Sequence, residues 1–98
     1  MSKQIEVTVD PIIRPFAETY RTETLSNLDR LEQLFENSDY VQIREIAHRL
    51  KGEGGTYGFD EVSKQGQLLQ KMCDDGDFAA IPGVIQHLRH FLLNVRIC

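Results

Sequence analysis

The chain of 98 residues lacks the features that mark several large classes of protein. Acidic residues outnumber basic ones by 15 to 11, and the net charge of -4 argues against a dedicated nucleic-acid binder. No apolar run approaches the roughly 20 residues of a membrane span, and residues 1–7 lack the apolar segment of a secretory signal. The two cysteines, Cys73 and Cys98, lie far apart, so we expect reduced thiols. One small soluble domain is therefore expected, in the cytoplasm.

Apolar residues recur with a helical period along most of the chain, and no strand pattern competes seriously with it. Residues 1–9 are expected to form a frayed or extended arm. Asp10 and Pro11 suit the start of a helix, which Pro15 should interrupt after about one turn. A long helix from Phe16 to about residue 37 should follow.

Three further helices are predicted from acidic caps followed by apolar stripes. Asp39, with Gln42 three residues later, matches a capping box, and Asp60 and Asp77 are expected to cap the next two helices. The apolar positions of the last helix are Phe78, Ile81, Ile85, Leu88, Leu92 and Val95. Short loops between these helices predict an all-α fold, an antiparallel up-and-down four-helix bundle with a short extra N-terminal helix, over residues 10–98.

The segment from His48 to Gly58, with sequence HRLKGEGGTYG, is the strongest functional signal. Ile43, Ile46, Ala47 and Leu50 form the apolar stripe of this helix, and His48 lies at its edge or outside it. Lys51 and Gly52 follow His48 by three and four residues, so they share its face. Glycine within a helix costs about 1 kcal/mol relative to alanine. An exposed imidazole, a cation and open space on one face therefore indicate a site.

These residues resemble the signature of histidine-containing phosphotransfer (HPt) domains, close to H-x-L-K-G-x-x-x-x-x-G. His48, Leu50, Lys51, Gly52 and Gly58 match it, and the resemblance covers about residues 11–97. It implies that His48 accepts a phosphoryl group from a phospho-aspartate and passes it to another aspartate. Lys51 would offset the charge of the phosphoryl oxygens and Gly52 would leave room for them. Leu50 would anchor the helix in the core, and Gly58 would serve a turn and close helix packing.

The resemblance also implies supporting residues and partners. A glutamine on the following helix often holds the imidazole in this family; Gln70 is the best candidate by spacing and Gln67 the second, and a solvated glutamine is the alternative for either. The expected partners are response-regulator receiver domains and a hybrid sensor kinase, and Mg²⁺ is expected on the receiver, with no cofactor bound by this chain. The expected partner-binding residues are Arg44, Arg49, Gly55, Ile12, Ile13 and Phe16.

Other interpretations remain open at this stage. Arg44 and Arg49 complement an acidic receiver pocket, or they are ordinary solvated charges; Phe16 and Tyr20 also suit the core. His87 and His90 have the spacing of a metal-ligand pair, although a third ligand is hard to assign. A non-catalytic bundle that only binds a signalling partner is the main alternative function. ATP-dependent kinase activity is not expected, because the chain has no room for a nucleotide-binding domain, and we expect a monomer.

Overall fold

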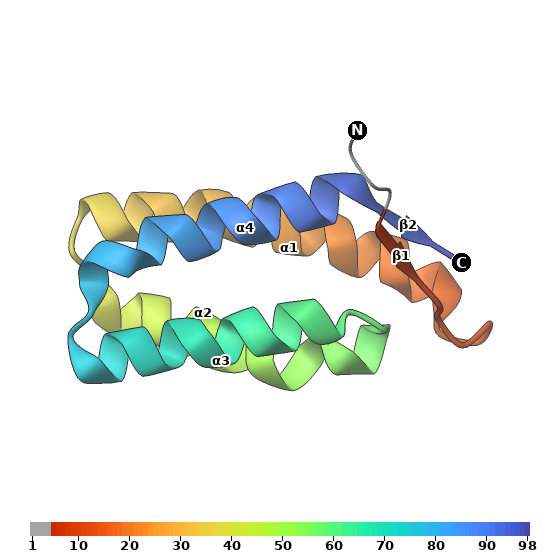
Figure 1. Cartoon of the computed structure of the whole chain (residues 1–98), viewed down its shortest axis with the longest axis horizontal. Coiled ribbons are helices and arrows are strands. Elements are labelled where there is room, and N and C mark those ends of the chain that lie inside the picture. Colours follow the sequence, from red (N-terminus) through yellow and green to blue (C-terminus); the bar gives the residue numbers. More distant parts are fainter. Residues whose placement is uncertain (1–4) are drawn as a thin grey trace.

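The computed structural model describes residues 5–98, which form four α-helices and one pair of short strands (Figure 1). The helices are α1 (Arg14–Glu36), α2 (Tyr40–Glu53), α3 (Asp60–Asp75) and α4 (Ile81–Asn94). Two single-turn 3₁₀ helices, η1 (Gly55–Tyr57) and η2 (Phe78–Ala80), precede α3 and α4. The predicted all-α bundle is confirmed. Within the described residues, no helix combines the length and the apolar character needed to cross a membrane.

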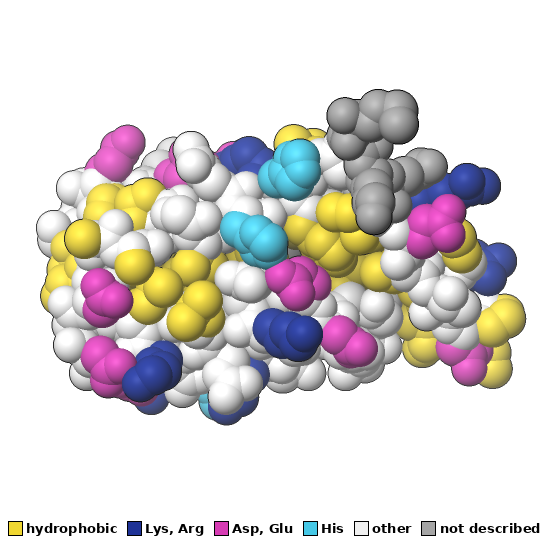
Figure 2. Space-filling model, viewed as in Figure 1, with side chains coloured by type: hydrophobic (Ala, Val, Ile, Leu, Met, Phe, Trp, Pro, Cys, Tyr) yellow, Lys and Arg dark blue, Asp and Glu magenta, His cyan; other side chains and the backbone are white. Residues whose placement is uncertain are grey.

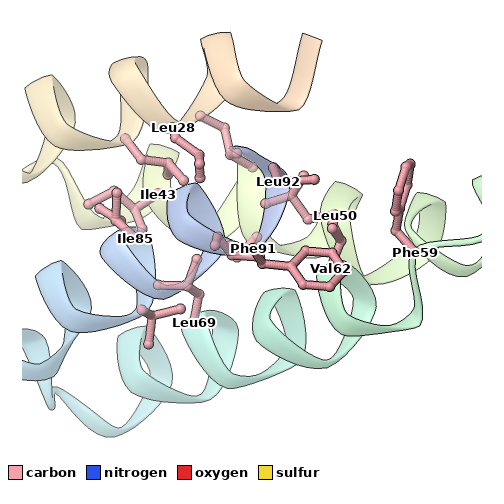
Figure 3. Close-up of a cluster of buried hydrophobic side chains, with 14 of the residues drawn as sticks. Leu28, Ile43, Leu50, Phe59, Val62, Leu69, Ile85, Phe91 and Leu92 are labelled. Atoms are coloured by element: carbon pink, nitrogen blue, oxygen red, sulfur yellow. The ribbon is translucent and has the colours of Figure 1, made fainter. Parts of the chain in front are cut away.

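The four helices enclose one hydrophobic core. Figure 3 shows side chains from every helix pointing into the space between them, including Leu28 of α1, Leu50 of α2, Leu69 of α3 and Leu92 of α4. The predicted inward stripe of α2 is buried in full: Ile43, Ile46, Ala47 and Leu50. Since that stripe faces the core, the opposite side of α2 must face solvent.

Helices α2 and α3 approach each other closely at Gly66. A Cβ atom on this residue would lie 2.6 Å from the backbone nitrogen of Lys51 and 2.8 Å from the carbonyl oxygen of Ala47. Farther along the pair, Arg44 of α2 forms an ion pair with Asp74 of α3. The later part of α2 thus lies beside the earlier part of α3, and the start of α2 lies beside the end of α3. These two helices therefore run in opposite directions.

A strand pair, which the sequence pattern did not predict, joins the two ends of the chain. Strand β1 (Ile5–Val7) pairs in parallel with β2 (Val95–Ile97), in a register that sets Ile5 opposite Val95. Val95 was expected in the last helix, but α4 ends at Asn94 and Val95 has extended backbone angles. Beyond β1, Val9 is buried at 3% exposure. The side chain of Val9 fills the place next to Gly58, where a Cβ would lie 2.6 Å from its Cγ2.

The expected short helix before Pro15 is a hydrogen-bonded turn. The carbonyl oxygen of Asp10 accepts from the backbone nitrogens of Ile13 and Arg14, and its carboxylate accepts from that of Ile12. Pro15 then lies in the first turn of α1, where a missing backbone N–H costs nothing. The proline therefore opens a continuous helix and does not interrupt one.

The predicted caps are only partly correct. The carboxylate of Asp39 accepts from the backbone nitrogen of Gln42, and its second oxygen accepts from the Gln42 side chain, as in a capping box. Asp60 is the first residue of α3 and not its cap, which is Phe59. Asp77 precedes η2 without a side-chain capping bond. Gly76 ends α3 in the left-handed conformation, with φ of 73°, which glycine adopts at little cost.

Candidate functional site

His48 lies on the solvent-facing side of α2. Ala47 and Leu50, one residue before and two residues after it, have 0% and 1% of their surface exposed, whereas His48 is exposed. Their burial fixes the rotation of α2 about its own axis. The imidazole is therefore held on a rigid helix while it remains open to another molecule.

Lys51 and Gly52 accompany His48 on this exposed surface. None of the ion pairs found among residues 5–98 involves Lys51. A Cβ placed on Gly52 would meet no atom within 4 Å. The space beside Gly52 is thus open to solvent, and the interior of the protein gives no reason for a glycine there.

Gln70 of α3 lies across from the His48 turn. Gly66 contacts the backbone of Ala47, and Asp74 binds Arg44; Gln70 lies between these two on the same face of α3, because residues four apart share a face. Its side-chain oxygen Oε1 is buried and has no hydrogen-bond partner among the described residues. Gln67, the second candidate, is exposed. Only Gln70 therefore presents an unsatisfied buried acceptor in this region.

Three arginines and one acidic residue, Glu45, line a shallow depression together with His48. Arg44 and Arg49 come from α2, and Arg30 comes from α1; the depression has a volume of about 380 Å³. Arg30 donates a hydrogen bond to the Gln42 side chain. Arg44 donates from Nε to Oδ1 of Asp74 at 2.5 Å. The sequence pattern did not indicate Arg30, because only the packing of α1 against α2 brings it to this side.

A protein-family match agrees with this geometry. The model of the Hpt domain matches residues 15–97, which is most of the chain. The protein belongs to the Hpt family. No curated protein and no solved structure matches the chain. Members of the Hpt family carry phosphoryl groups in phosphorelays, interact with receiver domains of two-component systems, and are not kinases.

The turn before α1 and the first turn of α1 expose apolar side chains in this Hpt domain. Ile12 is 78% exposed and Phe16 is 58% exposed, whereas Ile13 is partly buried. Phe16 lines a groove of about 120 Å³ with Tyr20 and Tyr57. Of the two aromatic residues that also suited the core, Tyr20 is buried and Phe16 is not.

Tyr20 and Tyr57 fix the neighbouring end of α2 against α1. Their rings stack with centroids 4.4 Å apart, and burial raises the pKa of Tyr20 to about 12. Tyr57 lies in η1 with Gly55, which is exposed and donates its backbone N–H to Oγ of Ser63. The exposed apolar residues at the start of α1 and the turn after α2 therefore lie at the same end of the Hpt bundle.

The other two histidines belong to a different face. Figure 2 shows histidine side chains next to acidic ones on the face formed by α3 and α4. Nε2 of His87 lies 2.6 Å from Oε2 of Glu61, and the His90 ring and carbonyl oxygen contact the Asn94 side chain. Within residues 5–98, no three His, Cys, Asp or Glu side chains are grouped closely enough to hold a metal ion. The pairing with Glu61 gives His87 a structural role that links α4 to α3.

Proposed function

We propose that this protein is the histidine phosphocarrier of a multistep phosphorelay, with His48 as the phosphoryl acceptor. The observation that carries the proposal is the position of His48: an exposed imidazole on a helix whose opposite face is buried, in a chain of the Hpt family. A ring nitrogen of His48 attacks the phosphorus of an aspartyl phosphate on a receiver. The bond from phosphorus to the carboxylate oxygen breaks, and the carboxylate leaves with the electron pair. The reverse step onto a second receiver releases the imidazole.

The residues beside His48 have distinct parts in this proposal. The Lys51 ammonium lies one turn from the imidazole and offsets the negative charge of the phosphoryl oxygens. Gly52 leaves the space that the phosphoryl group and the receiver loops occupy, which agrees with the open surface at its Cα. Mg²⁺ and the acidic residues that hold it belong to the receiver in this proposal, as phosphoryl transfer commonly uses a metal to offset charge.

We assign Gln70 the part of orienting the His48 ring. Its unpartnered Oε1 would accept a hydrogen bond from the ring N–H that does not react, which sets the tautomer. A buried acceptor without a partner costs about 1–3 kcal/mol. A hydrogen bond from the His48 ring would satisfy this oxygen of Gln70, whereas packing alone leaves it without a partner.

The docking surface proposed for the receiver surrounds His48. Arg44 and Arg49 supply positive charge at the depression, and Gly55, Ile12, Ile13 and Phe16 supply the turn and the apolar surface at the adjacent end of the bundle. Complementary charge favours encounter and orientation more than affinity. The upstream donor in this scheme is a hybrid sensor kinase through its receiver, and the carrier itself works as a monomer in the cytoplasm.

The test is phosphoryl transfer from a phosphorylated receiver domain to the purified protein. The wild-type chain should acquire acid-labile, base-stable label, and His48→Gln should acquire none. His90→Gln is the matched control, because His90 is exposed on α4 away from the depression. Equal labelling of wild type and His48→Gln would refute the assignment. If the wild type binds receivers without becoming labelled, the protein is an interaction module only.

A further inference from the structure

Arg44 has two possible anionic partners at the site. It lies one helical turn before His48, on the same face of α2 and in the same depression. In the unphosphorylated protein it donates from Nε to Oδ1 of Asp74 at 2.5 Å and from Nη2 to Oδ2 at 3.4 Å. Both side chains are about half exposed. The arginine can therefore leave this ion pair without opening the core.

Phosphorylation of His48 changes the balance between these partners. A phosphoryl group brings a charge of about -1.5 to -2 near neutral pH and three acceptor oxygens, whereas Asp74 brings one negative charge. Exposed ion pairs of the Arg44–Asp74 kind are weak and exchange readily. A long arginine side chain with a planar, forked donor group is suited to bind oxygens of a phosphoryl group.

We propose that Asp74 competes with the phosphoryl group on His48 for Arg44, and that this competition sets the lifetime of the phosphohistidine. The inference rests on the proposed function of His48. A guanidinium beside the phosphoryl oxygens stabilises their charge in the phosphohistidine. In hydrolysis a water oxygen bonds to phosphorus, the P–N bond breaks and the ring leaves with its electron pair. Arg44 is thus a positioning residue that slows hydrolysis, and Asp74 limits how much it does so.

The charges around the pair support this competition. Arg30, Arg49 and the carboxylate of Glu45 also line the depression, so Arg44 is one of several charges near His48. Arg44 is held by the carboxylate of Asp74, whereas Arg30 is hydrogen-bonded to the neutral Gln42 side chain, so removal of the Asp74 charge releases Arg44. On the next position of α3, Asp75 binds Lys71 within its own helix. The Asp75→Asn change therefore removes one negative charge from the neighbouring position, while both partners of the Arg44–Asp74 ion pair remain.

The test measures the lifetime of phospho-His48 in the intact protein, prepared with phosphoramidate. The imidazole attacks phosphorus, the P–N bond of phosphoramidate breaks and ammonia leaves. Asp74→Asn should slow the loss of the phosphoryl group about two- to fivefold, and Arg44→Ala should speed it by a similar factor, as expected for exposed ion pairs. Asp75→Asn should match wild type. The NMR signal of the Arg44 Nε–H should shift when His48 is phosphorylated, and a purely structural role of the pair would not move it.

The double variant decides whether Asp74 acts through Arg44. In the Arg44→Ala background, Asp74→Asn should no longer change the lifetime. If it still does, Asp74 acts by direct repulsion and the inference is wrong. An unchanged lifetime in Asp74→Asn, or an equal change in Asp75→Asn, would also overturn it. Chemical phosphorylation keeps this result separate from the proposed function, whose failure would appear as absence of transfer from receivers.

Discussion

Gly66 is the residue on which the distance between α2 and α3 depends, and its replacement by alanine tests this directly. An added Cβ would lie 2.6 Å from the backbone nitrogen of Lys51, 2.8 Å from the carbonyl oxygen of Ala47 and 3.0 Å from Cβ of Leu50. Two of these atoms belong to the backbone of α2, so no side-chain rotation can relieve the overlap. The two helices must move apart, and α2 carries His48 with it.

The expected loss of stability follows from two opposing effects. Alanine is favoured over glycine in a helix by about 1 kcal/mol, while overpacking of a closely packed contact costs typically about 1–3 kcal/mol, and more where the backbone must shift. We expect Gly66→Ala to lower the free energy of unfolding by about 1–2 kcal/mol. For a domain of this size, Tm should fall by roughly 4–16 °C.

Thermal and urea denaturation of Gly66→Ala and of a control variant measure this effect. Gly83 lies in α4, and a Cβ there would meet no atom within 4 Å. Gly83→Ala should therefore leave Tm unchanged or raise it slightly. If Gly66→Ala is as stable as Gly83→Ala, the close contact at Gly66 does not set the distance between α2 and α3.

Two further predictions concern the open glycine of the site and the ion pair on the opposite face. Gly52→Leu should retain or gain stability, because leucine is the better helix former and a Cβ at this position meets no atom within 4 Å. Phosphoryl transfer from a phosphorylated receiver should nevertheless slow roughly tenfold or more, which corresponds to about 1.4 kcal/mol in the activation free energy. Gly83→Leu is the control, and an unchanged transfer rate in Gly52→Leu would contradict the proposed role of Gly52. Burial raises the pKa of Glu61, but hydrogen bonds from His87 and Gln65 outweigh it and hold the pKa below its ordinary value. The resulting stabilisation is present above about pH 4.3 and is lost as the pH falls through the lowered pKa. Urea denaturation should therefore show wild type more stable than Glu61→Gln near pH 7, with the difference shrinking toward pH 3; a difference independent of pH would refute it.

The sequence was sufficient to predict the four helices, because each has a long amphipathic repeat. The stripe from Ile43 to Leu50 predicted which side of α2 is buried, and this placed His48 on the outer side before any tertiary contact was known. The Asp39 cap was also predicted, since its partner Gln42 is local in sequence. Local periodicity thus accounts for both the bundle and the exposure of the central residue.

What the sequence did not reveal depends on contacts between distant segments. Each strand has only three residues, and β1 and β2 pair across almost the whole chain, so no local pattern indicates them. Val95 continues the apolar spacing of α4 and was therefore assigned to the helix. Arg30 reaches the depression only because α1 packs beside α2. Gly66 was detectable in principle, as it falls in the buried stripe of α3 between Val62 and Leu69.

The glycines around the site differ in which atoms lie beside them. This difference distinguishes glycines that the packing of the protein requires from a glycine that it does not require. Gly58 has φ of 91° and contacts Val9, and Gly66 contacts the backbone of α2; both are explained by the protein's own atoms. Gly52 has no positive φ, and a Cβ placed on it would meet no atom within 4 Å. Glycine within a helix costs stability, and at Gly52, one residue before the end of α2, no neighbouring atom of the described residues requires it, as is also the case at Gly83 of α4. Gly52 differs from Gly83 in that it shares a helix face with His48, so the proposed approach of a receiver to the imidazole would account for Gly52 and not for Gly83.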